Sequence, residues 1–556
     1  MANPFNAGAG LTRASRLGDR ARFASASRNR QRASTFSATL IVWAIASMSV
    51  LTAPRTKAAE TPGASPPAAT GPTDDLDAER RELERQRREI DQKLADLDAR
   101  RRARAAATQP RAAETPAGVT AIPRHDDAIT QPPGRPEESI QTTPEPKWFN
   151  AHAQATAISQ GHDAFHAPYS GLNSLPRHEP WRTSVTGTLF LGAHLPWRGG
   201  QVYFDPEVAG GEGLGGVRGI AGFPNGEIPR VGTPEPEPYI ARLFYRQTFG
   251  FGGETEKIED GPNQLEGVQD ISRLTVTVGK FGAVDFLQQN SYTNDPRGQF
   301  FNWALFTDGA WDYPADTRGY TEGGVIELNQ PTWALRYAAM AEPKVANGGT
   351  LDSRVLNALG QSLEFEQRWN IGAHPGAARL MGFYNNSHAG KYQEALEHPG
   401  PHGPDVTLSR TFRGKYGFGL SAEQEVADGV GVFGRLSWND GHSETWAFTE
   451  IDRSAALGVS IKGTRWHRPE DVVGIAGVIN GISKDHRDYL AAGGFGFIIG
   501  DGRLNYGYEE ILEAYYLCKV ADHIFVTPDF QFVQNPAYNR DRGPVSIGGV
   551  RVHIEF

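Results

Sequence analysis

The chain ends with the segment VSIGGVRVHIEF, residues 545–556, in which apolar and polar side chains alternate. Successive residues of an extended strand point to opposite faces, so this segment would have one apolar and one polar face. A soluble domain rarely ends on an aromatic residue within a strand, because chain termini fray. The pattern predicts a last strand with one face in lipid, as in an outer-membrane β-barrel. The residues of the apolar face are Val550, Val552, Ile554 and the terminal Phe556.

The same alternation recurs upstream in strand-sized segments. In residues 361–370, Leu363 and Phe365 fall on one face. Glu364 and Glu366 fall on the opposite face. The apolar faces carry Trp, Tyr or Phe near the strand ends, as the interfacial girdles of membrane barrels do, and the polar faces carry Arg and Glu, which suits a water-filled lumen. The other segments of this kind are residues 240–249, 271–279, 332–340 and 431–438.

Two all-β architectures fit this alternation. A secreted β-sandwich would also alternate, with its polar face in water. The aromatic strand ends, the charged inner faces and the C-terminal strand favour a transmembrane antiparallel β-barrel. We therefore expect an all-β barrel over residues 148–556.

The composition narrows the class further. The 556 residues include 64 Gly and 37 Pro, which suits many strands separated by turns better than a helical enzyme. The net charge of -9 and the lack of a basic face give no sign of a nucleic-acid partner. One cysteine, Cys518, excludes an internal disulfide.

The first 147 residues differ from the rest of the chain in composition. Residues 1–59 combine a long basic lead with a short apolar run and small residues, the order of a secretory signal; the run is short for a membrane anchor. Residues 60–147 are rich in Pro and polar residues and predict a periplasmic linker. Within it, residues 74–104 predict a helix, either a short coiled coil that joins copies of the chain or a solvated single helix. The heptad positions are Leu76, Leu83, Ile90 and Leu97.

Two long stretches resemble a known family. They are VGKFGAVDFLQQNSYTNDPRGQFFNWALFTDGAWDYPADTRGY, residues 278–320, and YEEILEAYYLCKVADHIFVTPDFQFVQNPAYNRDRGPVSIGGVRVHIEF, residues 508–556. Both closely resemble the carbohydrate-selective porins of the OprB type, and the likeness extends from about Trp148 to the end. Pro528 interrupts the tail, and because proline lacks an N–H we expect a strand start, a bulge or a bend there.

The resemblance implies an outer-membrane porin, a water-filled barrel of about 16 strands. It implies passive diffusion of small sugars, glucose-like mono- and oligosaccharides, with no energy source, no cofactor and no enzymatic step. The implied partners are the sugars, outer-membrane lipid and the barrel assembly machinery, which would recognise Phe556. The N-terminal extension would lie in the periplasm.

Polar residues on the predicted inner faces are candidates for the pore lining. Guanidinium and carboxylate groups can hydrogen-bond sugar hydroxyls. The alternative is that they form structural ion pairs across the wall. The candidates are Arg242, Arg246, Arg273, Arg336, Glu364, Glu366, Arg368 and Arg435.

Residues 290–318 form a long segment without strand alternation. Long ordered loops are usually functional, so this one is predicted to narrow the pore. The alternative is an ordinary extracellular loop held by aromatic packing. The candidate constriction residues are Asp295, Arg297, Asn302, Trp303, Asp308, Trp311, Asp312 and Arg318.

Other motifs carry little weight. GEGLGG at residues 211–216 matches a dinucleotide-binding pattern, but no helix pattern follows it. His162 and His166 lack the glutamate of a metalloprotease motif, and no catalytic triad can be recognised. We therefore expect no metal site and no enzyme. The remaining alternatives are a barrel enzyme acting on glycans, or an envelope-tethering structural protein that binds them.

The heptad pattern generates a test of the N-terminal segment. If Leu76, Leu83, Ile90 and Leu97 form a seam, a peptide of residues 74–104 should gain helix as its concentration rises. Circular dichroism over a concentration series and sedimentation equilibrium measure this. Helix content that is independent of concentration would indicate a solvated single helix.

Overall fold

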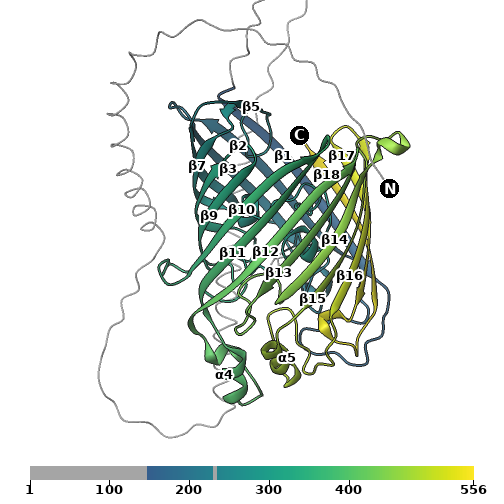
Figure 1. Cartoon of the computed structure of the whole chain (residues 1–556). Helices are drawn as coiled ribbons and strands as arrows, with labels where there is room; N and C mark the ends of the chain where they lie inside the picture. Colours follow the sequence, from purple (N-terminus) through teal and green to yellow (C-terminus); the bar gives the residue numbers. More distant parts are fainter. Residues whose placement is uncertain (1–146, 229–233) are drawn as a thin grey trace, which may run out of the picture. The chain divides into compact units, whose positions relative to one another are not determined.

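The computed structural model describes residues 147–228 and 234–556. Within these residues, sixteen antiparallel strands form a closed barrel (Figure 1). The predicted barrel and its number of strands are thus confirmed. The predicted signal sequence, the coiled-coil segment and the linker up to residue 146 lie outside the described residues.

The strands of the barrel follow one another around the wall in chain order. They are β1 (Phe149–His162), β2 (Arg182–His194), β3 (Gly200–Gly211), β4 (Glu237–Gly250), β7 (Arg273–Phe281), β8 (Thr321–Asn329), β9 (Trp333–Ala341), β10 (Leu359–Ile371), β11 (His374–Ala389), β12 (Thr411–Ala427), β13 (Val430–Asn439), β14 (Arg453–Lys462), β15 (Val472–Gly481), β16 (Glu509–Ala521), β17 (Ile524–Gln534) and β18 (Val545–Glu555).

The first and last strands close the barrel. β1 pairs with β18 from Gln154 opposite Glu555 to His162 opposite Ile547. β4 pairs directly with β7, since the two strands between them form a separate small sheet. The elements outside the wall are β5 (Thr255–Ile258), β6 (Gly267–Asp270), α3 (Trp303–Phe306), α4 (Tyr392–Glu397), α5 (Lys484–Ala491), η2 (Leu214–Gly216), η3 (Ala283–Asp285), η4 (Val406–Ser409), η5 (Gly463–Trp466) and η6 (Pro536–Tyr538).

The alternation in the sequence corresponds to the two faces of the wall. On β10, Leu363 is 53% exposed and Phe365 is 44% exposed, whereas Glu364 between them is fully buried. On β18, Val550 is exposed and Arg551 is fully buried. The apolar face therefore points outward and the charged face points inward, as a membrane barrel requires.

The two ends of the barrel differ in their connections (Figure 1). At the end that holds the C-terminus, the turn end, most connections are short turns. At the opposite end, the loop end, the connections are long, as residues 282–320 and 482–508 illustrate. Outer-membrane barrels have the same asymmetry, with short periplasmic turns and longer extracellular loops. The shortest turns are residues 330–332, 372–373, 428–429 and 522–523.

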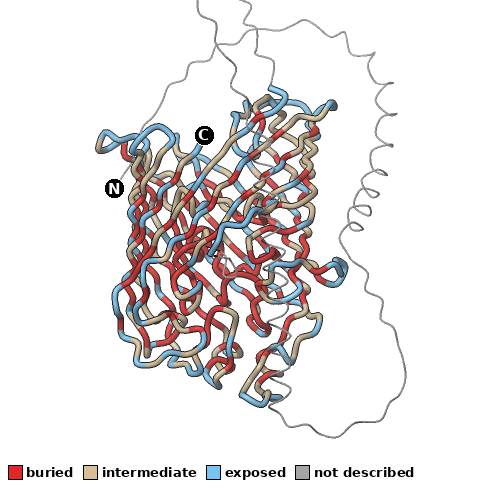
Figure 2. Tube along the Cα trace, turned by 180° about the vertical axis from the view of Figure 1, so that it is seen from behind, coloured by how far each residue is buried: buried red, intermediate tan, exposed pale blue. Residues whose placement is uncertain are grey.

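Several loops of the loop end are buried. Phe300, Phe301 and Leu305 have no exposed surface, and Trp446 is 1% exposed. Figure 2 shows buried segments gathered in the half of the barrel farther from the C-terminus. The loops therefore fill part of the lumen. No helix within the described residues is long and apolar enough to cross a bilayer.

Pro528 lies inside β17, not at its start. Its pairing with β18 is regular, with Pro528 opposite Val550. On the other side, the pairing with β16 passes from Tyr515 opposite Asp529 directly to Cys518 opposite Val526. The missing N–H therefore interrupts one ladder without a bulge at the proline.

The outward apolar face generates a stability prediction. Leu457, in the middle of β14, is 71% exposed. Replacing Leu457 by Arg would place a charge in lipid and should lower the free energy of unfolding by about 2–4 kcal/mol. Leu457→Ala is the matched control and should cost less. Denaturant titration in lipid vesicles measures both, and an Arg variant as stable as the Ala variant would contradict the assignment of this face to lipid.

Candidate functional site in the barrel lumen

Residues 282–320, the crossing loop, connect β7 to β8 and extend across the lumen. Arg551 on β18 donates to the carbonyl oxygen of Gln299 at 2.7 Å. Glu513 on β16 accepts the backbone N–H of Asn302 at 3.0 Å. In the order of strands around the barrel, β16 and β18 are far from β7 and β8. The crossing loop is thus attached to the opposite wall.

A second attachment comes from β13. Arg435 donates to the carbonyl oxygens of Thr293 at 2.7 Å and Gln288 at 3.1 Å. Its guanidinium also lies 3.3 Å from the carboxylate of Asp308. Burial raises the pKa of Asp308 to about 6, although Arg435 works in the opposite direction. With a further bond to the carbonyl oxygen of Phe306 at 3.3 Å, Arg435 holds the crossing loop by four of its residues.

A third attachment joins the crossing loop to another loop. The carboxylate of Asp312 accepts the backbone N–H groups of Trp446 at 2.9 Å and Ala447 at 2.8 Å. Lys415 on β12 lies 3.4 Å from the same carboxylate. Burial raises the pKa of Asp312, and Lys415 opposes that rise. Asp312 therefore stabilises the contact between the two loops.

The short helix α3 lies within the crossing loop. Asn302 caps it by accepting the N–H of Ala304 at 3.0 Å, and its amide donates to the carbonyl oxygen of Gly222 at 2.8 Å. Trp303 is 5% exposed and stacks on Phe448, with ring centroids 4.4 Å apart. The rings around α3 therefore form a packed aromatic cluster.

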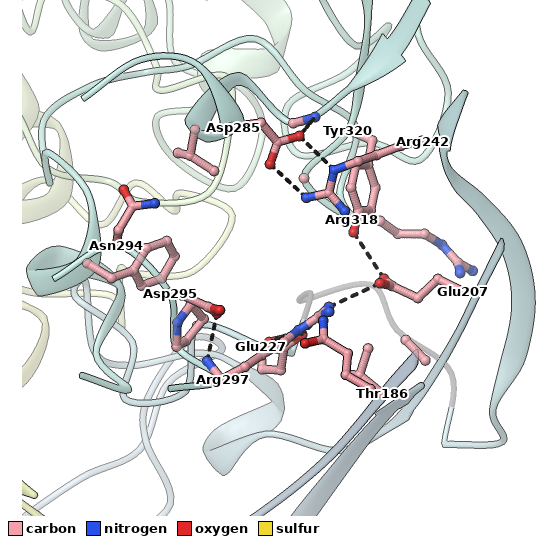
Figure 3. Close-up of a pocket in the computed structure, with 18 of the residues that line it drawn as sticks. Thr186, Glu207, Glu227, Arg242, Asp285, Asn294, Asp295, Arg297, Arg318 and Tyr320 are labelled. Atoms are coloured by element: carbon pink, nitrogen blue, oxygen red, sulfur yellow. Dashed lines mark hydrogen bonds and ion pairs between the residues drawn. The ribbon is translucent and has the colours of Figure 1, made fainter. Parts of the chain in front are cut away.

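A cavity of about 830 Å³ lies between the crossing loop and the inner wall of β2, β3 and β4 (Figure 3). Acidic and basic side chains face one another across it. Aromatic rings of Tyr239, Phe306 and Tyr320 complete its lining. Its charged lining residues are Glu207, Glu227, Arg242, Arg246, Asp285, Asp295, Arg297, Arg318 and Glu555.

Arg297 of the crossing loop joins two carboxylates. Its Nε donates to Glu227 at 2.8 Å and its Nη2 donates to Glu207 on β3 at 3.0 Å. Asp295 turns the backbone by accepting the N–H of Arg297 at 2.8 Å. Burial alone would lower the pKa of Arg297, but Glu227 and Glu207 outweigh it and raise the pKa well above its ordinary value. Arg297 remains charged and pins the loop to the wall.

Arg242 on β4 makes a second ion pair on the cavity wall. Its guanidinium donates two parallel hydrogen bonds to Asp285, both at 2.7 Å, and lies 3.5 Å from Asp205. It also lies over the ring of Tyr320, 5.2 Å from the centroid. The hydroxyl of Tyr320 donates to Glu207 at 3.1 Å. The two ion pairs are therefore connected through Tyr320.

Arg318 and Arg246 have fewer acidic partners. Arg318 donates to Glu237 at 3.1 Å and stacks over Tyr239, 4.1 Å from the centroid. Its side chain keeps 26% of its surface exposed. Arg246 lies over the ring of Tyr203 and donates to a backbone carbonyl oxygen. The side chain of Arg318 is therefore more exposed than those of Arg242 at 16% and Arg297 at 12%.

The structure separates the residues predicted from sequence into three groups. Around the cavity lie Arg242, Arg246, Asp295, Arg297, Trp303 and Arg318. The attachments of the crossing loop contain Asn302, Asp308, Asp312 and Arg435, while Trp311 is buried beside Tyr313. The third group contains Arg273, paired with Glu256, and the network of Arg336 with Glu364 and Glu366, to which Arg368 is joined. Within this network, Glu364 also accepts the backbone N–H of Gln288 in the crossing loop.

The sequence did not reveal several residues of the cavity. Glu207 lies on β3, where Tyr203, Asp205 and Glu207 are buried and Phe204 is exposed. The alternation continues through Pro206, although the register of β3 with β4 shifts there from Asp205 opposite Arg242 to Pro206 opposite Ile240. The alternation of apolar residues with Asp205 and Glu207 is the signal that could have identified this strand. The other residues missed are Glu227, Tyr239, Asp285 and Tyr320.

The contacts of Arg297 generate a prediction about the crossing loop. Arg297→Ala would leave Glu207 and Glu227 buried without their counter-charge, which should cost about 3 kcal/mol of local stability. Adding Glu227→Gln should restore part of it. Hydrogen exchange of the amides of the crossing loop measures the free energy of local opening. Arg354→Ala is the control, since the side chain of Arg354 is 55% exposed and lies outside the crossing loop. Unchanged exchange in Arg297→Ala would contradict the proposed role of Arg297 in holding the loop.

Comparisons with known proteins agree with this geometry. The family described as carbohydrate-selective porin, OprB family, matches residues 189–556. The high-pH structure of Pseudomonas putida OprB has the same fold, with a TM-score of 0.54 at 15% identity over 73% of this chain and 94% of that chain. The outer membrane channel DcaP of Acinetobacter baumannii gives a TM-score of 0.41 at 10% identity, over 73% of this chain and 97% of that chain. No curated protein matches the sequence.

The family match covers well over half of the chain and includes the crossing loop and every barrel strand from β3 onward. The sixteen-stranded barrel is the fold expected of such a channel. The chain therefore belongs to the OprB family of carbohydrate-selective porins, outer-membrane channels through which sugars diffuse passively.

Proposed function

We propose that sugars cross this barrel through the cavity of about 830 Å³ beside the crossing loop, and that its paired charges select them. The observation that carries the proposal is the pairing itself. Arg297 faces Glu207 and Glu227, and Arg242 faces Asp285. Because the charges are paired, the wall attracts free ions weakly, yet it still offers strong donors and acceptors to an uncharged solute.

A sugar presents hydroxyl groups at its edges and apolar C–H groups on its faces. Guanidinium and carboxylate groups can replace the hydration shell of the hydroxyls. The rings of Tyr239 and Tyr320 offer flat surfaces for the C–H faces. The affinity of the cavity for a sugar has to stay low overall, since a channel must release what it binds. A cavity of this volume falls within the range of small-molecule sites, which suits glucose-like sugars.

The other predicted pore residues receive a supporting role in this proposal. Arg336 bridges Glu364 at 2.9 Å and Glu366 at 2.8 Å on the inner wall. Glu364 also accepts the backbone N–H of Gln288 at 2.7 Å. We propose that this network, together with Arg435, supports the crossing loop from the inner wall. Solutes would meet the more accessible Arg318 instead.

The proposal extends to the parts of the chain outside the barrel. Residues 1–59 would direct export, and residues 60–147 would form a periplasmic linker whose segment 74–104 could join copies of the chain. Phe556, exposed at the end of β18, would be the residue presented to the assembly machinery. We expect no hydrolysis of an offered oligosaccharide, and hydrolysis would favour a barrel enzyme. Binding to other envelope components through residues 60–147 would favour a tethering role.

Single-channel recording with sugars as blockers tests the proposed selectivity. Arg318→Ala should weaken the sugar block about tenfold, since it removes a charge-assisted hydrogen bond of about 1.4 kcal/mol, and should also change ion selectivity. Arg297→Ala should also weaken the sugar block. Trp303→Ala should change sugar block more than ion conductance, because its ring shapes the cavity without carrying charge.

The control is Arg354→Ala, an exposed arginine at the loop end whose partner is Asp352. It should leave the sugar block unchanged. Wild-type sugar block in the Arg318, Arg297 and Trp303 variants alike would show that this cavity is not the selective site.

A further inference from the structure

One connection at the turn end is far longer than its neighbours. Residues 372–373, 428–429 and 522–523 join strands in tight turns at this end. The connection from β4 to β7 instead occupies residues 251–272 and contains the hairpin of β5 and β6. Figure 1 shows β5 at the same end of the barrel as the C-terminus. A turn of two residues would suffice to join β4 and β7, so the additional residues need an explanation.

The tip of this hairpin, residues 260–264, returns to the inner wall. The amide of Asn150 on β1 donates to the carboxylate of Asp260 at 2.6 Å and to the carbonyl oxygens of Gly261 at 3.1 Å and Gln264 at 2.8 Å. Asn150 is 7% exposed. One buried side chain thus holds three residues of the tip.

A second set of contacts ties the tip to the cavity. Asn263 donates to Asp205 on β3 at 2.8 Å, and its own carbonyl oxygen accepts Arg246 at 3.1 Å. Asp205 in turn lies 3.5 Å from Arg242. Pro262, Asn263 and Gln264 all line the cavity. The tip therefore touches the same charged wall as the crossing loop, but approaches it from the turn end.

The hairpin depends on these anchors for its position. An isolated two-stranded hairpin is marginally stable in water. Val268 on β6 is 72% exposed, so the hairpin has little core of its own apart from Leu265, which is 3% exposed. Its base is held by the ion pair of Arg273 with Glu256 at 2.5 Å. Arg273, which the alternation placed on the lumen face, thus secures this hairpin.

We propose that the hairpin tip is a second selectivity element, placed where solutes pass between the cavity and the periplasmic side. The proposal rests on the cavity being the solute path. Asp260 is the one charged residue of the tip, and its carboxylate is already in contact with Asn150 and His152. The remaining groups are amides and carbonyls, so the tip can exchange hydrogen bonds with an uncharged polyol without attracting ions strongly. A sugar that has passed the crossing loop meets this hairpin tip before it reaches the periplasm.

The hairpin can be deleted without disturbing the pairing of β4 with β7. Phe251 already donates its N–H to the carbonyl oxygen of Ser272 at 2.9 Å. Gly252 and Gly253 have φ of 82° and 100°, and a two-residue hairpin turn of type I′ requires positive φ at both positions. Removing residues 254–271 leaves Phe251-Gly252-Gly253-Ser272, a two-residue turn like its neighbours.

Current recordings in planar bilayers, with maltose or glucose added to one chamber at a time, test the element. In channels of one orientation, the deletion should raise conductance and increase the blocking on-rate several-fold for sugar added at the turn end. The on-rate from the loop end should change much less, since the crossing loop is intact. A heat-modifiable band confirms that the barrel has assembled.

Asn263→Gly provides a second variant that does not depend on the deletion. Glycine keeps the positive φ of 55° at this position and removes the amide that donates to Asp205. It should shift the turn-end on-rate in the same direction, by a smaller factor. Lys257→Ala, on an exposed part of the same hairpin, is the control and should match the wild type.

The outcomes separate this inference from the proposed function. Altered sugar block in Arg318→Ala, with wild-type conductance and on-rates in the deletion and in Asn263→Gly, would overturn the role of the hairpin and keep the cavity as the solute path. Wild-type behaviour in Arg318→Ala, Arg297→Ala and the hairpin variants alike would overturn both. A turn-end effect in the hairpin variants and not in Lys257→Ala supports the second selectivity element.

Discussion

Lipid offers no hydrogen-bond partner, so every backbone N–H and C=O group in a membrane-spanning strand must be paired within the protein. In this chain the pairing of β1 with β18 meets that requirement, because it removes the two free edges that sixteen strands would otherwise have. Closure also fixes the side chains. Once the ladders are set, alternate residues must face lipid, and the remaining ones must face the lumen.

The inward face then determines what fills the lumen. Arg435 and Arg551 are buried and spend most of their donors on carbonyl oxygens of the crossing loop. Glu513 uses its carboxylate in the complementary way and accepts backbone N–H groups. Charged wall residues thus replace water as partners for an irregular backbone, which would otherwise be costly to bury. Beside β2, β3 and β4, charged wall residues and the crossing loop instead line a polar cavity.

The barrel could be predicted from sequence because its determinant is local. The neighbours Leu363 and Glu364 already show which side of their strand faces lipid and which faces the lumen. The pattern within one strand is sufficient for this assignment. The cavity depends on contacts between distant positions. Arg551 and Gln299 are separated by 252 residues, and no periodicity relates them. Glu207 lies on a strand that alternates regularly, but its partner Arg297 is 90 residues away, and Glu227 lies in a loop without a repeating pattern. The segment predicted to narrow the pore lies within the crossing loop, and several of its residues anchor that loop and do not face the cavity.

The attachment of the crossing loop to β16 and β18 makes the position of this loop depend on the last strands of the chain. Residues 282–320 leave the ribosome well before residues 509–555, yet their partners Glu513 and Arg551 lie on those last strands. Before β16 and β18 are in place, the crossing loop lacks two of its anchors. Those contacts form only when the last strands join the sheet, so the filling of the lumen and the closure of the wall are coupled steps of folding.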